Sequence, residues 1–130
     1  MISSILRFLA CVVCYDVWFY VVHRLLHTPR LYAKYHSQHH QHMRPTYRET
    51  FVASTAENCV SGLGIFVPLL NCSTFSLPVF AAAYLYCLVR GVLRHDSRAS
   101  WLVGDHHLIH HLQPNKNFSS YYVDVIFGTC

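Results

Sequence analysis

The chain has 130 residues, of which 53% are hydrophobic and only 12% are charged. Its net charge of +4 is modest, and it does not indicate a nucleic-acid-binding surface. The apolar residues occur in runs, which is typical of a protein whose apolar surface faces a bilayer. Composition therefore predicts one membrane domain over residues 1–130 and argues against a nucleic-acid-binding protein.

The first predicted element is an apolar helix over residues 5–22, which has about the minimum length for crossing a bilayer. It contains Asp16, and an acid inside a membrane span is costly unless it has a partner. Asp16 precedes His23 by two helical turns and shares its face. We expect its carboxylate to orient an imidazole at a metal site. The alternative is a carboxylate that faces a neighbouring helix or a water-filled cavity.

A histidine-rich stretch follows, with six histidines between His23 and His42. His23 and His27 are four residues apart and therefore share one face of a helix. Pro29 is predicted to end that helix or to begin the next one. A second helix is predicted over residues 31–41, and it carries the HSQHH motif of residues 36–40. Imidazole is the commonest neutral metal ligand, so this stretch indicates a metal site.

Two further apolar runs, over residues 51–70 and 75–93, are joined by a short polar turn and predict a membrane hairpin. Half of the ten basic residues lie in residues 24–48, so the positive-inside rule places this stretch in the cytoplasm. The hairpin returns residues 94–130 to the same side. We therefore predict an all-α integral membrane helical bundle of about three apolar segments with a cytoplasmic histidine-rich metal site.

The last motif, HLIHH over residues 107–111, repeats the histidine spacing of residues 36–40. Histidine tracts that only sequester metal are usually polar and low in complexity, whereas these motifs alternate with large apolar residues. Four further side chains are candidates for orienting imidazole N–H groups: Asp16, Asp105, His106 and Asp124. The predicted metal ligands in the three motifs are His23, His27, His36, His39, His40, His107, His110 and His111.

These motifs, in this order, resemble those of the fatty acid hydroxylase/sterol desaturase superfamily of membrane-bound non-haem di-iron oxygenases. The resemblance rests on HRLLH (23–27), HSQHH (36–40), HLIHH (107–111) and the tail NFSS (117–120). His95 stands where members place an isolated histidine ligand, and Asp16 matches an acid before the first motif. Within the superfamily, HRLLHTP and NFSS are most similar to 4-methylsterol monooxygenases, with sterol C-5 desaturases and cholesterol 25-hydroxylase next.

The resemblance implies an enzyme of the endoplasmic reticulum membrane that hydroxylates or desaturates a lipid, with a sterol favoured. It implies two Fe ions as cofactors, O2 as oxidant, and electrons from NAD(P)H supplied through cytochrome b5 and its reductase. Relatives usually carry one or two further membrane helices before the first motif. We therefore expect an N-terminally truncated chain, a minimal version, or one that needs a partner to complete the bundle.

Two other functions stay open. A membrane zinc hydrolase would use a His-bound water and a nearby glutamate as base, but Glu49 and Glu57 both lie outside the histidine motifs. A non-catalytic metal-binding membrane remnant of the same superfamily is the second alternative. The missing helices favour the remnant, whereas nine intact candidate ligands argue against it.

Overall fold

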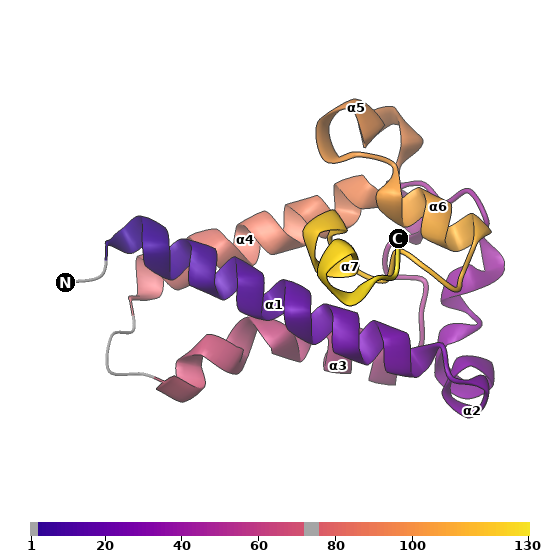
Figure 1. Cartoon of the computed structure of the whole chain (residues 1–130), viewed down its shortest axis with the longest axis horizontal. Coiled ribbons are helices and arrows are strands. Elements are labelled where there is room, and N and C mark those ends of the chain that lie inside the picture. The colour runs from indigo at the N-terminus through magenta and orange to yellow at the C-terminus, as the bar shows by residue number, and fades with distance from the viewer. Residues whose placement is uncertain (1–2, 72–75) are drawn as a thin grey trace.

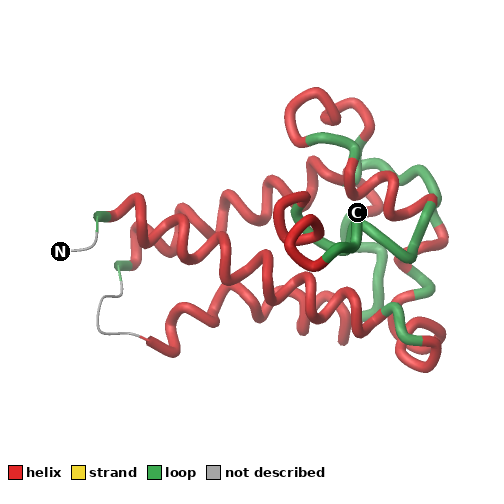
Figure 2. Tube along the Cα trace, in the orientation of Figure 1, coloured by secondary structure: helices red, strands yellow, loops and turns green. Residues whose placement is uncertain are grey.

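The computed structural model describes residues 3–71 and 76–130, and every regular element in these ranges is helical (Figure 2). The all-α prediction is therefore confirmed. Short 3-10 helices at Tyr47–Glu49 and Ser97–Ala99 join the longer elements. The α-helices are α1 (Ser4–Leu26), α2 (Pro29–Leu31), α3 (Thr55–Gly62), α4 (Leu77–Arg94), α5 (Ser100–Val103), α6 (His106–Leu112) and α7 (Tyr121–Phe127).

Two of these helices, α1 and α4, are long and apolar enough to cross a membrane. The Ser3 hydroxyl caps α1 by accepting a hydrogen bond from the Leu6 amide at 3.3 Å. The helix continues past the predicted end at residue 22 and includes His23. Pro29 then occupies the first turn of α2, as predicted. The N–H groups of a first helical turn have no intrahelical acceptor, so proline, which lacks an N–H, is tolerated there.

The second apolar run differs from the prediction of a membrane-crossing segment, because it forms α3 followed by a 3-10 helix over Leu63–Asn71. Glycines and Pro68 weaken the α-helix in this run. Gly64 lies against the ring of Trp18, where a Cβ atom would come within 2.5 Å of Cδ1. The Trp18 indole N–H also donates to the Val60 carbonyl at 2.8 Å. Close packing against α1 thus shapes this segment.

The arms of the predicted hairpin nevertheless run in opposite directions along α1 (Figure 1). Residues 72–75, which include most of the predicted polar turn, lie outside the described residues. Because α4 returns beside α1, His95 reaches the same end of the bundle as the first two histidine motifs. A small apolar core lies between these helices, and it includes Cys11, Ile65 and Cys87. The two buried cysteines in it are free thiols and pack as small apolar side chains.

The helix predicted over residues 31–41 is not one regular α-helix. A π-helix spans Tyr32–His36, in which the Ser37 amide donates to the Tyr32 carbonyl at 2.8 Å, and a 3-10 helix spans His39–Gln41. Changes of helical pitch rotate successive side chains, and such irregular turns are common at functional sites. Here they aim the neighbouring side chains of His39 and His40 at two different groups of histidines.

Candidate metal centre

Nine histidines converge at one end of the bundle and form two clusters. Each histidine offers one ring nitrogen, and within a cluster these nitrogens all lie within 4.8 Å of one another. Every predicted ligand falls into one of the two. The first cluster consists of His23, His27, His36, His40 and His110, and the second consists of His39, His95, His107 and His111.

The first cluster is centred on the Nε2 atom of His36. This atom lies 3.1 Å from Nε2 of His23, 2.9 Å from Nε2 of His27 and 3.1 Å from Nε2 of His40. A ring nitrogen carries either one proton or one lone pair, so hydrogen bonds cannot account for three such neighbours. Several nitrogen lone pairs that point at one another need a cation between them. The donor set therefore fits a metal ion.

In two histidines of this cluster, the opposite ring nitrogen lies beside a backbone carbonyl oxygen. The Nδ1 atom of His23 lies 2.5 Å from the Phe118 carbonyl, and that of His110 lies 2.6 Å from the Lys116 carbonyl. Because a carbonyl only accepts, Nδ1 carries the proton, and the Nε2 lone pair is left to face the cluster centre. Buried metal-ligating histidines are oriented in this way.

The second cluster also brings Nε2 atoms of several histidines together. Nε2 of His95 lies 3.2 Å from Nε2 of His39 and 3.0 Å from Nε2 of His107, while its Nδ1 donates to the Gly91 carbonyl at 2.8 Å. Both ring nitrogens of His111 are buried, and neither has a hydrogen-bond partner within the described ranges. An unpaired buried polar atom is costly. A cation bound to this cluster would satisfy one of the two nitrogens.

Electrostatics keeps these imidazoles neutral. Burial is the main cause that lowers the pKa of His36, His39 and His95 from 6.5 to about 4. Burial, together with neighbouring imidazoles, lowers the pKa of His27 and His110 to about 3. Neutral imidazole is the form that binds a metal ion, so at neutral pH the clusters are ready to bind without losing protons.

Among the described residues, the Asp16 carboxylate forms no hydrogen bond or ion pair with an imidazole. It forms an ion pair with Arg90 of α4 and accepts a hydrogen bond from the Tyr122 hydroxyl of α7 at 2.7 Å. The buried carboxylate thus joins three helices. These contacts correspond to the alternative in which the acid faces a neighbouring helix, and they differ from the expected imidazole contact.

The other candidates for orienting imidazoles lie at the edge of the site. His106 is outside both clusters, and its Nε2 atom lies 3.1 Å from the Asp124 carboxylate. The Asp124 carboxylate also accepts hydrogen bonds from the backbone N–H groups of Phe118 and Ser119. It thereby holds the segment whose Phe118 carbonyl lies beside Nδ1 of His23. Asp105 is exposed, and its carboxylate forms no hydrogen bond or ion pair with an imidazole within the described part of the chain.

Glu57 is the carboxylate that the sequence reasoning missed. Its Oε1 atom accepts a hydrogen bond from Nδ1 of His36 at 2.7 Å, and both side chains are buried. Glu57 lies outside the histidine motifs, so motif spacing does not select it. The signal was nevertheless present, since an acid within the apolar run 51–70 requires a buried partner.

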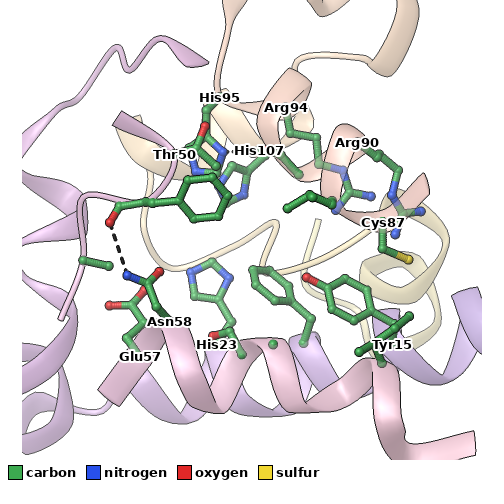
Figure 3. A pocket seen from close by; sticks show the side chains of 18 of the residues that line it. Tyr15, His23, Thr50, Glu57, Asn58, Cys87, Arg90, Arg94, His95 and His107 are labelled. Atoms are coloured by element: carbon green, nitrogen blue, oxygen red, sulfur yellow. Dashed lines mark hydrogen bonds between the residues drawn. The ribbon is translucent and has the colours of Figure 1, made fainter. Parts of the chain in front are cut away.

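A cavity of about 270 Å³ lies beside the clusters, between α1, α3 and α4 (Figure 3). Imidazoles from both clusters line one end, including His23 and His95. Ile65 and Leu88 contribute apolar wall further along. This arrangement places an apolar chamber directly against the candidate metal centre.

Comparison with known proteins gives matches across this region. The sequence profile of the fatty acid hydroxylase family matches residues 8–129. Methylsterol monooxygenase erg25B of Aspergillus fumigatus is 31% identical over 120 residues, which cover 81% of this chain and 40% of that protein. Methylsterol monooxygenase 1 of Rattus norvegicus is 36% identical over 67 residues, or 52% of this chain and 23% of that protein.

A third relative, fatty acid hydroxylase ahd1 of Mycosarcoma maydis, is 38% identical over 64 residues, which cover 49% of this chain and 16% of that protein. The chain thus aligns with less than half the length of each of these relatives. No solved structure matches.

Proposed function

We propose that this chain, which belongs to the fatty acid hydroxylase family, is a membrane-bound oxygenase that hydroxylates or desaturates a lipid. A sterol is the favoured substrate, since two of the three relatives described above are named methylsterol monooxygenases. The observation that carries the proposal is the pair of buried, neutral histidine clusters beside an apolar cavity.

The proposed cofactors are two iron ions, one held by the five histidines of the first cluster and one by the four of the second. Nitrogen donors of this kind also suit zinc and copper, so the choice of iron rests on the family. Bound iron would supply the activation of O2 needed to oxidise an unactivated C–H bond. The convergent lone pairs and the unpartnered nitrogens of His111 support the assignment of these residues as ligands.

The chain's own residues would perform the positioning. Glu57 and the carbonyls of Phe118, Lys116 and Gly91 hold protons on Nδ1 and keep the opposite lone pairs aimed at the cluster centres. Burial at the end of the bundle excludes water from the reacting carbon. The apolar cavity wall would hold the lipid with one end beside His95.

The proposed location is the endoplasmic reticulum membrane, with the clusters at the cytoplasmic face. The basic stretch of residues 24–48, next to the first cluster, supports this orientation. Electrons would come from NAD(P)H through cytochrome b5 and its reductase. Residues 1–130 are proposed to form a single hydroxylase-type membrane domain.

The main alternative is a metal-binding remnant without catalysis. A zinc hydrolase has less support. Glu57 is hydrogen-bonded to Nδ1 of His36, whereas the Nε2 atom of the same ring faces the cluster. The carboxylate is therefore poorly placed as a base for a metal-bound water.

The test combines metal content and lipid turnover on one membrane sample that also contains cytochrome b5 and its reductase. We expect two irons per chain and oxygen-dependent oxidation of a sterol. His39→Ala and His110→Ala should abolish oxidation and leave membrane insertion intact, because each removes one ligand from a different cluster. His42→Ala is the matched control, since His42 is exposed and lies outside both clusters.

Full activity in either cluster variant would contradict the site assignment. Metal binding without turnover of any lipid supplied would support the remnant.

A further inference from the structure

Two arginines of α4, Arg90 and Arg94, line the same cavity as the histidine clusters (Figure 3). They lie one helical turn apart and therefore share a face of α4. Arg90 donates to both carboxylate oxygens of Asp16 and is neutralised by it. Arg94 has no such partner within the described residues, where its hydrogen bond is to the Ser120 hydroxyl at 2.5 Å. Arg94 is thus a cavity-lining guanidinium without a carboxylate partner in the described residues, because Asp16 pairs with Arg90 and the lining acid Glu57 is hydrogen-bonded to His36.

An uncompensated guanidinium in an apolar wall is costly unless an acceptor binds it. Arg94 carries five N–H donors, and Ser120 accepts from one of its nitrogens. A carboxylate is the group whose two oxygens match the planar donor fork of arginine.

We propose that this cavity selects a lipid that bears a carboxylate, and that Arg94 determines this selectivity by binding the acid group. The proposal rests on the proposed function, because it names the substrate class of that same site. The apolar wall, which includes Phe19, Ile65 and Leu88, takes the hydrocarbon next to the acid group. Because Arg94 and His95 line the same cavity and His95 belongs to the second cluster, carbons close to the carboxylate would lie near that cluster.

The cavity size favours one hydrocarbon over a phospholipid. Its volume of about 270 Å³ lies just below the range of roughly 300–1,000 Å³ that is usual for small-molecule sites. It therefore takes the acid end of a single chain or ring system, not a glycerophosphate with two chains. Tyr84 and Leu88 line the cavity and are also exposed on α4, so the rest of the lipid extends outward there. Fatty acids and steroid acids both present this group.

The experiment measures binding, with no electron donor present, to the full chain in detergent micelles. One arm compares tritiated palmitic acid with tritiated hexadecanol by scintillation proximity. A second arm compares a steroid acid, cholanic acid, with cholesterol as competitors. We expect the acid to bind about tenfold tighter or more than the matched alcohol in at least one arm, as for a charge-assisted hydrogen bond.

Arg94→Gln should remove this preference, while Arg94→Lys should keep part of it because the charge remains without the planar fork. Arg24→Gln is the matched control, since Arg24 is exposed and does not line the cavity. Elution volume and unfolding midpoint report whether each variant folds. If Arg94→Gln does not fold, the acid-to-alcohol ratio of the unmodified chain and the Arg94→Lys variant decide the question.

Equal binding of acid and alcohol in both arms, or an unchanged preference in folded Arg94→Gln, would overturn the proposal. These outcomes are independent of oxidation. A chain that oxidises a neutral sterol but shows no preference for acids refutes only the role of Arg94. A chain that prefers acids through Arg94 yet oxidises no lipid refutes only the proposed function.

Discussion

Replacing Glu57 should weaken metal binding at the first cluster. The carboxylate accepts a hydrogen bond from Nδ1 of His36 at 2.7 Å, and His36 is only 1% exposed. In Glu57→Ala this N–H group stays buried without a partner, which costs about 1–3 kcal/mol. The loss of orientation at His36 corresponds to roughly a 10- to 100-fold weaker affinity for metal at this cluster. Glu57→Gln should lose less, because the amide oxygen can accept the same hydrogen bond.

The assay is metal retention against a chelator series in purified protein, with metal counted by mass spectrometry. We expect Glu57→Ala to release metal from the first cluster at lower chelator concentration and to keep metal in the second cluster, where Glu57 forms no hydrogen bond. Glu49→Ala is the matched control, because the half-buried Glu49 carboxylate accepts hydrogen bonds from Thr46 and lies outside both clusters. If Glu57→Ala retains metal at both clusters like the unmodified chain, the hydrogen bond does not orient His36 and the reasoning fails.

Two further predictions concern stability. Gly64→Ala should destabilise the fold by about 1–3 kcal/mol, because the new Cβ would overlap the Trp18 ring. Gly62→Ala is the control, since the space around Gly62 is open and no destabilisation is expected. Thermal unfolding in detergent compares the two variants. Burial by itself would raise the pKa of Asp124, but hydrogen bonds from His106 and Thr129 outweigh it and hold the pKa below its ordinary 3.8. Because the folded carboxyl binds its proton more weakly than the unfolded one, its stabilisation is present above pH 3.8 and is lost as the pH falls below it. Asp124→Asn should flatten the fall of the unfolding midpoint in this acid range, and an unchanged slope would show that Asp124 does not contribute.

Much of this protein follows from local sequence. Hydropathy and length identified α1 and α4, since an apolar run of sufficient length needs no partner to form a helix. Pro29 marked the break between α1 and α2 through its fixed backbone angle and missing N–H. The spacing of the histidine motifs also singled out eight of the nine residues that the structure brings together, whereas His95 was expected from the family resemblance. These features depend on neighbours along the chain, so periodicity and composition predict them.

Tertiary packing decided how those residues are partnered. His39 and His40 are adjacent in the chain yet enter different clusters, because irregular helical turns aim them separately. Asp16 pairs with Arg90, 74 residues away, and not with the imidazole two turns along its own helix. Glu57 reaches His36 only because the segment after the second motif folds back along α1. Such pairs form because charged groups are buried between helices that are distant in sequence. Local periodicity does not predict contacts of this kind.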